Sequence, residues 1–355
     1  MKQNYELKPL FVERMKSLLG KAEYERYKKS IESAPLRSIR VNTLKISEEN
    51  LKKRLEKKSW IVKQPFEDYP EIMIILGKFV NENLEDENEK KLLVKSLAGE
   101  EGDKRAENER KITDLEPGEL GRALEHLLGY YYIQEISSML PAIALNPKPG
   151  EIVLDLCAAP GSKTTQMASM MNNRGVLIAN DTSFSRIKIL ASNLERCGVT
   201  NAIIIKKEGV ALCKKIKSSD FLLDKILVDA PCSGEGTIIS NRKTSLMWNI
   251  NTVKSLSKMQ KKLLESAIEI LKIGGEIVYS TCTHAPEENE EVLDYILKKF
   301  DNLKMEKINL PIKCAQGVLK WADENYNKEV EKSCRIYPHV TGMEGFFIAK
   351  MRKTK

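Results

Sequence analysis

From about residue 130 onward, short apolar stretches of strand length alternate with longer stretches of helical periodicity. The strand-like stretches are Glu151–Leu156, Gly175–Asn180, Asn201–Ile205, Lys225–Asp229 and Glu276–Ser280. The helix-like stretches between them are Ser162–Met171, Ser183–Cys197 and Thr252–Leu271. Strands that alternate with helices over this length predict an α/β fold with a doubly wound, mostly parallel sheet and right-handed crossovers.

The residues before this alternation have a different pattern and predict a smaller N-terminal region. Apolar residues at helical spacing over residues 10–19 indicate an amphipathic helix, Ser38–Lys45 resembles a short strand, and Leu51–Lys58 is helix-like. Residues 81–115 are rich in Glu, Asn, Lys and Asp with few apolar anchors, so we expect an exposed insertion or a partly disordered loop there. The expected domains are residues 1–128 and residues 129–355.

The charge distribution bears on the partner of the N-terminal region. The net charge of +8 arises from 58 Lys and Arg residues against 50 Asp and Glu residues. Residues 1–60 hold 16 basic and 8 acidic side chains, whereas residues 81–110 hold 6 basic and 10 acidic ones. A basic region suits a polyanion such as nucleic acid, because lysine and arginine neutralise phosphates and release counterions. A solvated, lysine-rich helical surface would have the same composition, so charge alone leaves both interpretations open.

Composition also bears on location and on metal binding. The sequence has no apolar run near the roughly 18 residues of a membrane span, and its first residues lack a signal-peptide core, so we expect a cytoplasmic location. The seven cysteines are odd in number and lack paired spacing, so we expect reduced thiols rather than a disulfide scaffold. A zinc site would need paired CxxC or His–Cys spacing. We find no such spacing in the sequence, so no metal is expected. The cysteines expected to be small buried hydrophobes are Cys197, Cys213, Cys314 and Cys334.

Ligands of doubly wound sheets bind beyond the carboxyl ends of the strands. The first predicted strand leads into DLCAAPGSKTT (155–165), whose small residues let the backbone turn sharply and approach a ligand. The helix after this run offers free N–H groups that suit a carboxylate or a phosphate. The run is neither GxGxxG nor a Walker P-loop. A mere tight turn would explain the glycine, but it explains Lys163 and the DLCAAP run less well.

The second and third predicted strands are followed by acidic residues. Asp181 lies about 20 residues beyond the glycine turn, where a carboxylate accepts hydrogen bonds from ribose hydroxyls. Because a helix follows at once, a helix-capping role is the alternative for Asp181. Glu208 follows the third strand and could reach an adenine amino group, although a single Glu carries little information.

The fourth and fifth predicted strands each end near a cysteine. Asp229 and Cys232 lie in DAPCSG, and Cys282 lies in YSTC. Thiols at the functional edge of a sheet are nucleophile candidates, because polar neighbours there favour a thiolate. The alternatives are buried hydrophobes and a redox disulfide between Cys232 and Cys282, which has no CxxC support. The acidic run Pro286–Glu290 is expected to form the first turn of the next helix and to favour its dipole.

Together these motifs resemble the RNA cytosine-5 methyltransferases of the Sun/nucleolar-protein type, which use S-adenosylmethionine (SAM). The resemblance covers nearly the whole chain, and two strand-end cysteine motifs combined with CAAPG are highly specific. It implies a Rossmann-like SAM-dependent methyltransferase fold with a smaller N-terminal α/β RNA-binding domain. The matching segments are Ile39–Thr43, Gly129–Met139, DLCAAPGSKT, DAPCSG, YSTC, PEENEE, Arg335–Pro338 and Gly345–Phe347.

The resemblance also implies a role for each residue that matches the family's motifs. The loop Cys157–Lys163 would wrap the methionine part of SAM, Asp181 would bind the ribose hydroxyls, and Arg186 would brace this site. Asp229 would face both SAM and the target base, and Glu208 stands where the family usually has Asp near the adenine. The implied cofactor-binding residues are Cys157, Ala158, Ala159, Pro160, Gly161, Ser162, Lys163, Asp181, Arg186, Glu208 and Asp229.

The chemistry of such an enzyme assigns the reactive groups. Carbon 5 of cytosine is a poor nucleophile, and thiolate addition at carbon 6 makes it enamine-like, so that it can attack the SAM methyl group. In the family the attacking thiol is that of the Thr-Cys motif, here Cys282, and Cys232 resembles the second cysteine needed to release the adduct. Asp229, if protonated, could donate to ring nitrogen 3, and Lys163 could add positive charge nearby. The target base must leave its stack to reach this pocket.

The expected function is methylation of carbon 5 of a cytosine in RNA, by a monomer. The size of the chain, which resembles that of compact archaeal members, favours tRNA, and ribosomal RNA is the closest alternative. A DNA cytosine-5 methyltransferase would use the Pro-Cys thiol of Cys232, but the presence of Cys282 favours the RNA type. A non-catalytic RNA-binding assembly factor is a further alternative, although the SAM loop and both cysteines are intact. In the N-terminal region, Arg40 and Asn42 are candidates to grip RNA.

Overall fold

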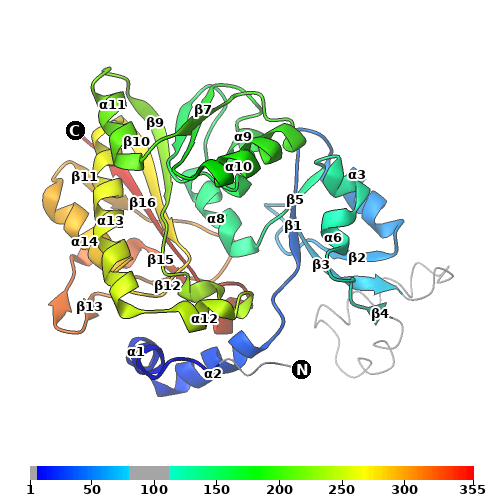
Figure 1. Cartoon of the computed structure of the whole chain (residues 1–355), viewed down its shortest axis with the longest axis horizontal. Coiled ribbons are helices and arrows are strands. Elements are labelled where there is room, and N and C mark those ends of the chain that lie inside the picture. Colours follow the sequence, from blue (N-terminus) through cyan, green and yellow to red (C-terminus); the bar gives the residue numbers. More distant parts are fainter. Residues whose placement is uncertain (1–5, 80–111) are drawn as a thin grey trace. The chain divides into compact units, whose positions relative to one another are not determined.

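The computed structural model describes residues 6–79 and 112–355 (Figure 1). The insertion expected at 81–115 therefore lies outside the described residues except for positions 112–115. No helix in the described part of the chain is long and apolar enough to cross a membrane. The chain forms two compact units. The large unit comprises Met1–Pro35, Ser137–Glu195 and Val199–Lys355, and the small unit comprises Leu36–Ile136 and Arg196–Gly198.

The large unit is built on a mixed sheet whose central strands are parallel. Its strands are β6 (Ile152–Asp155), β7 (Val176–Asp181), β8 (Ala202–Lys206), β9 (Leu223–Asp229), β10 (Leu271–Thr281), β11 (Leu303–Glu306), β12 (Ala315–Gln316), β15 (Cys334–Ile336) and β16 (Phe346–Lys353). The parallel strands have the order β8-β7-β6-β9-β10, and β16 pairs antiparallel with β10. The order reverses between β6 and β9, where doubly wound sheets bind ligands. The predicted fold class is confirmed.

Helices join the parallel strands, and apolar residues of several of these helices lie in the cores around the sheet. The helices of this unit after β6 are α9 (Ser162–Met170), α10 (Phe184–Cys197), α11 (Gly209–Lys217), α12 (Lys243–Met247), α13 (Ile250–Glu269), α14 (Glu290–Lys299) and α15 (Pro338–Thr341), and α8 (Ile136–Leu145) precedes it. The longest, α13, is capped by Asn249, which accepts from the N–H of Asn251 at 2.8 Å. Leu264 and Ile268, four residues apart, are fully buried against β9 and β10 residues in the main core. Short elements complete the unit: β13 (Lys320–Trp321), β14 (Glu324–Asn325), η2 (Glu235–Ile239) and η3 (Lys328–Lys332).

The first two helices, α1 (Pro9–Leu19) and α2 (Lys21–Glu32), belong to the large unit. Phe11 is buried, as the helical spacing predicts, and its ring lies edge-on to that of Trp248 with centroids 5.5 Å apart. Arg14 donates two hydrogen bonds to Glu287, at 2.9 and 2.7 Å. These contacts explain why residues 1–35 cluster with the large unit, whereas the sequence analysis expected a single N-terminal region up to residue 128.

The small unit is an antiparallel sheet with helices on it (Figure 1). Its elements are β1 (Ser38–Val41), α3 (Glu48–Glu56), β2 (Trp60–Lys63), β3 (Ile72–Phe79), β4 (Ile112–Thr113), α6 (Glu119–Arg122), α7 (Leu124–Leu127) and β5 (Tyr131–Ile133). The strand order is β2-β3-β1-β5, and β4 pairs with β3. Leu51 and Leu55 of α3, four residues apart, are fully buried in its core. The predicted strand near Ser38 and the predicted helix near Leu51 are confirmed.

Arg40 and Asn42 of the small unit are buried. Each is 2% exposed: Arg40 donates to Gln134 Oε1, and Asn42 donates to the carbonyls of Gly129 and Cys197, both at 2.8 Å. Burial lowers the pKa of Arg40 to about 10. The prediction that both residues grip RNA is therefore wrong, because buried side chains that tie core segments together cannot reach a phosphate.

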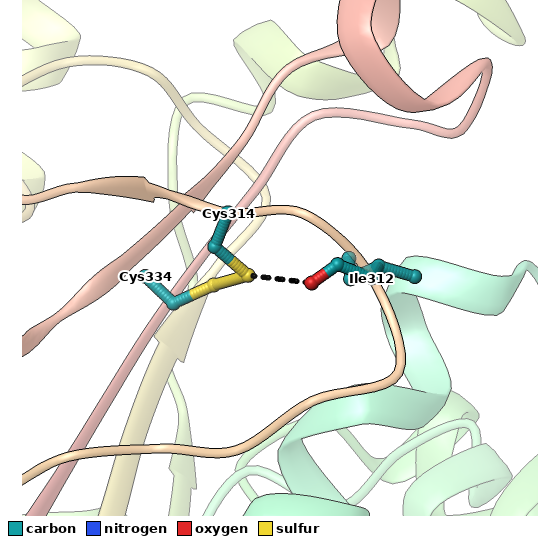
Figure 2. The surroundings of a disulfide bond; sticks show 3 residues. All are labelled: Ile312, Cys314 and Cys334. Atoms are coloured by element: carbon teal, nitrogen blue, oxygen red, sulfur yellow. Dashed lines mark hydrogen bonds between the residues drawn. A yellow bond between two sulfur atoms is a disulfide. The ribbon is translucent and has the colours of Figure 1, made fainter.

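One pair of cysteines is joined, contrary to the prediction of reduced thiols. Cys314 and Cys334 form a disulfide with Cα atoms 5.3 Å apart (Figure 2). The Cys314 sulfur lies 3.9 Å from the carbonyl oxygen of Ile312. Antiparallel pairing of β12 with β15 sets Gln316 opposite Cys334 and so brings Cys314 near it, a register that cysteine spacing does not reveal. The free cysteines are Cys157, Cys197, Cys213, Cys232 and Cys282.

Candidate active site

The turn after β6, which contains the predicted cofactor loop, is fixed by β7 and α10. The N–H of Ala158 donates to a β7 carbonyl at 2.7 Å, and Asn193 of α10 donates to the carbonyl of Pro160 at 2.9 Å. Gly161 has φ +105°, and a Cβ at this position would lie 2.9 Å from Leu190 Cδ1. Glycine is required here by both the backbone conformation and the close approach of α10. The structure therefore holds this loop rigidly at the carboxyl edge of the sheet.

Asp155, the last residue of β6, is a buried acid to which the sequence analysis assigned no role. It is 1% exposed, and its Oδ2 accepts from the Thr164 hydroxyl at 2.7 Å. Its Oδ1 has no hydrogen-bond partner among the described residues. Burial raises the pKa of Asp155 to about 7. An unpaired buried oxygen beside the CAAPGS loop would be satisfied by a hydrogen-bond donor on a ligand. Its place in DLCAAPG was the available sequence signal.

Asp181 and Arg186 meet at the same loop. The carboxylate of Asp181, which is 3% exposed, accepts from the N–H groups of Ser183 at 3.0 Å and Ala159 at 3.3 Å. Arg186 Nη1 lies 3.3 Å from Asp181 Oδ2, and Arg186 also donates to the carbonyl of Ala159. Asp181 thus supports the turn into α10, as the capping interpretation expected, and stays the candidate for a ribose contact.

Glu208 makes contacts of a different kind. It is exposed, and its carboxylate caps α11 by accepting from the N–H groups of Val210 at 3.1 Å and Ala211 at 2.7 Å. These two bonds engage one oxygen each and explain why an acidic residue suits this position. A contact between Glu208 and an adenine remains a prediction.

Asp229 and Lys163 form an ion pair where β9 ends. Lys163 Nζ lies 2.8 Å from Asp229 Oδ2 and donates to the hydroxyl of Ser138 at 2.9 Å. The Ser280 hydroxyl donates to Asp229 Oδ1 at 2.7 Å. Lys163 is 7% exposed and also lies over the ring of Phe346, 5.2 Å from its centroid. The structure therefore brings together two predicted site residues and adds Ser280, which sequence reasoning had passed over.

The two predicted thiols lie side by side. The sulfur atoms of Cys232 and Cys282 are 3.0 Å apart without a bond between them, and the N–H of Cys282 donates to Cys232 Sγ at 3.3 Å. The hydrogen bond with Cys282 and burial raise the pKa of Cys232 well above its usual range. Parallel pairing of β9 with β10 sets Asp229 opposite Ser280 and so brings both loops to one edge. This arrangement can deliver two thiols to a single ligand atom or to neighbouring atoms.

The acidic run after Cys282 corrects the sequence interpretation. The predicted helix begins only at Glu290, so Glu287 and Glu288 precede it rather than form its first turn. Glu288 is fully buried and accepts from the N–H of Ser233 at 3.0 Å and from Gln260 Nε2 at 2.8 Å. Its partners lie on distant elements, so no helical pattern in the sequence signalled this contact.

The strand order, the turn after β6 and the acid at the end of β7 are those of a Rossmann-like fold. This chain belongs to the RsmB/F family, whose model, described as 16S rRNA methyltransferase RsmB/F, matches residues 142–352. A second model, described as the N-terminal domain of 16S rRNA methyltransferase RsmF, matches residues 7–66. The family that the motifs indicated is thereby confirmed.

The relatives of this chain include two kinds of enzyme. A protein of Pyrococcus abyssi named tRNA (cytosine(49)-C(5))-methyltransferase is 46% identical over 235 residues, which cover 66% of this chain and 74% of that protein. Ribosomal RNA small subunit methyltransferase F of Vibrio campbellii is 35% identical over 357 residues, which cover 99% of this chain and 64% of that protein. The chain spans about half to two thirds of the length of the methyltransferase F relatives it matches.

Two solved structures from Pyrococcus horikoshii support the fold assignment over nearly the whole chain. NSun6 with SFG has a TM-score of 0.76 and 26% identity, and the match covers 98% of each chain. A methyltransferase homolog protein has a TM-score of 0.75 and 34% identity, with 98% of this chain and 96% of that chain covered.

Proposed function

We propose that this protein uses SAM to methylate carbon 5 of a cytosine in RNA, with tRNA as its substrate. The observation that carries the proposal is the pair of free thiols, Cys232 and Cys282, 3.0 Å apart at the ends of neighbouring strands. Covalent catalysis on a pyrimidine ring needs one thiol to add and a proton acceptor to release the product. The name of the P. abyssi relative states the same reaction on tRNA.

The residues around the CAAPGS loop fit SAM. The unpaired Oδ1 of Asp155 can accept from the amino group of the methionine part, and the carboxylate of Asp181 can accept from the ribose hydroxyls. NSun6, which has the same fold, contains SFG, a SAM analogue. When bound, SAM supplies an electrophilic methyl group, and the other steps belong to side chains of this protein.

The two thiols divide the covalent work. The Cys282 thiolate adds to carbon 6 of the cytosine, and the electron pair of the former carbon 5–carbon 6 double bond becomes nucleophilic at carbon 5. After methylation, Cys232 releases its own proton to solvent, the carbon 5–hydrogen bond breaks, and the carbon-5 proton passes to the Cys232 thiolate. The electron pair left behind restores the double bond, and the carbon 6–sulfur bond breaks to return the Cys282 thiolate.

The pKa of Cys232 suits this order of events. The hydrogen bond with Cys282 is the largest cause of the raised pKa of Cys232, so Cys232 keeps its proton while Cys282 is free. Once Cys282 is bonded to the base it can no longer become an anion. The largest single cause of the raised pKa of Cys232 is then lost, which favours its thiolate as the base that release requires.

Lys163 and Asp229 have an electrostatic role. Thiolate addition moves negative charge toward ring nitrogen 3, and a preorganised cation lowers the cost of that charge. The 2.8 Å ion pair with Asp229 and the hydrogen bond to Ser138 hold the Lys163 ammonium in one place. Asp229 orients this ammonium and offers a hydrogen-bonding group to the base edge.

Ribosomal RNA is the second candidate substrate. It is favoured by the match of residues 7–66 to the N-terminal domain of RsmF and by the methyltransferase F relative that aligns with 99% of this chain. The higher identity of the P. abyssi tRNA enzyme, 46%, supports tRNA. The proposal includes residues 1–128 as the RNA-binding region, supported by 16 basic against 8 acidic residues in 1–60. A cytoplasmic, monomeric enzyme completes it.

The test is sequencing of 5-methylcytosine in total RNA incubated with SAM and the full-length protein, beside Cys282→Ala and Cys232→Ala. We expect methylation at one tRNA position with the wild type and none with Cys282→Ala. We expect a covalent protein–RNA adduct that persists on denaturing gels with Cys232→Ala. Methylation confined to ribosomal RNA would show that ribosomal RNA, and not tRNA, is the substrate. An adduct lost in Cys232→Ala but kept in Cys282→Ala would reverse the roles of the two thiols.

A further inference from the structure

Glu288, in the turn before α14, is 0% exposed and has no cation partner among the residues that the structure describes. Its Oε2 accepts both of its hydrogen bonds, from the N–H of Ser233 at 3.0 Å and from Gln260 Nε2 at 2.8 Å. Its Oε1 has no hydrogen-bond partner in the same part of the chain. Burial of an acid without a compensating charge is costly, which points to a role beyond packing.

The partners of Glu288 lie on both sides of Cys232. Gln260, also fully buried, donates from the same Nε2 to the carbonyl of Pro231 at 2.8 Å. Ser233 gives its main-chain N–H to Glu288. The buried pair Glu288–Gln260 therefore fixes the residues directly before and directly after the thiol. These contacts attach the DAPCSG loop to α13 and to the turn before α14.

Cys282 is held through separate contacts. Asn289, which is fully buried, accepts from the Thr281 hydroxyl at 2.6 Å and donates to the carbonyl of Thr283 at 3.0 Å. These bonds fix the residues on either side of Cys282. Glu288 thus helps to fix the main chain around Cys232, and Asn289 fixes the main chain around Cys282. A hydrogen bond of 2.7 Å between the hydroxyls of Ser233 and Thr283 links the two loops.

The other groups that face Glu288 do not neutralise it. Tyr279 donates its hydroxyl to the carbonyl oxygen of Glu288 at 2.5 Å, and the nearby acid Glu235 of η2 adds negative charge. Burial, the largest cause, raises the pKa of Glu288 to about 7. The hydrogen bond with Cys282 and burial are the largest causes of the raised pKa of Cys232, and the negative charge of Glu288 raises this pKa further. Contacts and charge therefore both couple Glu288 to Cys232.

We infer that Glu288 is a positioning residue for the release step, which with Gln260 holds the main chain around Cys232 so that this thiol can take the carbon-5 proton. The inference rests on the proposed function and extends it to residues that do not touch the base. Because Asn289 fixes the residues around Cys282 through hydrogen bonds of its own, adduct formation and adduct release are expected to respond differently to substitution of Asn289 and of Glu288.

The main test measures the two steps separately. Full-length variants are incubated with unfractionated RNA and labelled SAM, and the first methyl transfer, the multiple-turnover rate and the gel-stable adduct are quantified. For Glu288→Ala and Gln260→Ala we expect about tenfold slower turnover and about tenfold more adduct, with first transfer within about threefold of wild type. Asn289→Ala is expected to lower first transfer and adduct together.

Two further variants separate positioning from a general effect on folding. Glu288→Gln keeps an acceptor oxygen for Ser233 and Gln260, so turnover should return to within about threefold of wild type. Glu287→Gln is the matched control, since its carboxylate contacts Arg14 and Trp321 instead, and all three quantities should stay at the wild-type level. The inference is overturned if Glu288→Ala lowers adduct and first transfer together, or if it behaves like Glu287→Gln.

A second measurement needs no substrate. Alkylation of each cysteine by iodoacetamide in the free protein is followed by peptide mass spectrometry, and Cys232 should react about fivefold or more faster in Glu288→Ala and Gln260→Ala. Cys282 should change less. If the wild type methylates no RNA, the proposed function fails, yet alkylation still decides whether Glu288 holds Cys232. The inference is overturned if the rate of Cys232 alkylation is unchanged in both variants. If Glu288→Ala does not fold, the alkylation rate in Gln260→Ala decides.

Discussion

Two regions of the large unit each contain a cysteine pair and a buried glutamate, but they use them differently. In the thiol region, Cys232 and Cys282 are unbonded at 3.0 Å and Glu288 has only neutral donors. In the C-terminal region, Cys314 and Cys334 are joined. There Glu290, only two residues beyond Glu288, forms a buried two-point ion pair with Arg335.

The difference separates groups that stabilise the fold from groups that react. Arg335, 2% exposed, also donates to the carbonyl of His284 at 2.9 Å and to the hydroxyl of Tyr337 at 3.2 Å, so its donors and the charge of Glu290 are satisfied. In the thiol region an oxygen of Glu288 has no hydrogen-bond partner among the described residues, and neither sulfur is in a disulfide. Titratable groups left incompletely satisfied are typical of functional sites. The contrast therefore agrees with placing the chemistry at Cys232 and Cys282.

The largest expected effect is the loss of the ion pair in the C-terminal region. Arg335→Met leaves Glu290 buried without its cation and should lower the free energy of unfolding by about 3–5 kcal/mol in urea denaturation. Arg26→Met is the control, because Arg26 pairs with Glu23 on the exposed face of α2 and its loss should cost less than about 0.5 kcal/mol. A loss below about 1 kcal/mol for Arg335→Met would show that this region is not held by its charges.

A smaller effect is expected from the disulfide. The double variant Cys314→Ser/Cys334→Ser opens a loop whose ends are 20 residues apart. It should lower the free energy of unfolding by about 3 kcal/mol, since the unfolded chain is no longer restrained. Methylation should stay within about twofold, since neither cysteine is in the thiol region. Wild type unfolded in the presence of a reductant should match the double variant, and equal stability of oxidised wild type and variant would remove the contrast between the two cysteine pairs.

Much of the fold was predictable because its signals are local in the sequence. The strands β6, β7 and β9 carry continuous apolar runs, and α13 has helical periodicity, so element type and order followed directly. The turn after β6 and the meeting of both strand-end thiols were also predictable, since small residues and cysteines stand directly after strands whose carboxyl ends share one edge.

The remainder depends on contacts between residues far apart in the sequence. Glu288 and Glu290 stand in the same acidic run, yet Glu288 meets Ser233, 55 residues away, and Glu290 meets Arg335, 45 residues away. Composition could not tell these two carboxylates apart. Arg40 showed the same limit, because a basic residue in a strand suits either a phosphate or a buried amide, and only the packing of β1 decided between them.

The smallest of the three effects concerns the proton on Glu288. Its pKa of about 7 is above the ordinary 4.5, so the folded protein binds this proton more tightly than the unfolded chain does. The stability that this proton contributes is full below the unfolded pKa and is lost as pH rises through the folded pKa. From about pH 5 to about pH 6.5 the wild type should therefore lose about 2 kcal/mol relative to Glu288→Gln, which cannot titrate.

Urea denaturation of both proteins across this pH range measures the difference, and Glu287→Gln supplies a control of opposite sign. Burial favours the neutral form of Glu287, but hydrogen bonding and charge from Arg14 lower its pKa below 4.5, so its contribution is lost only at lower pH. The difference between wild type and Glu287→Gln should stay flat from about pH 5 to about pH 6.5. If the Glu288→Gln difference is equally flat, Glu288 is as well compensated as its neighbour, and the contrast between the two regions rests on the thiols alone.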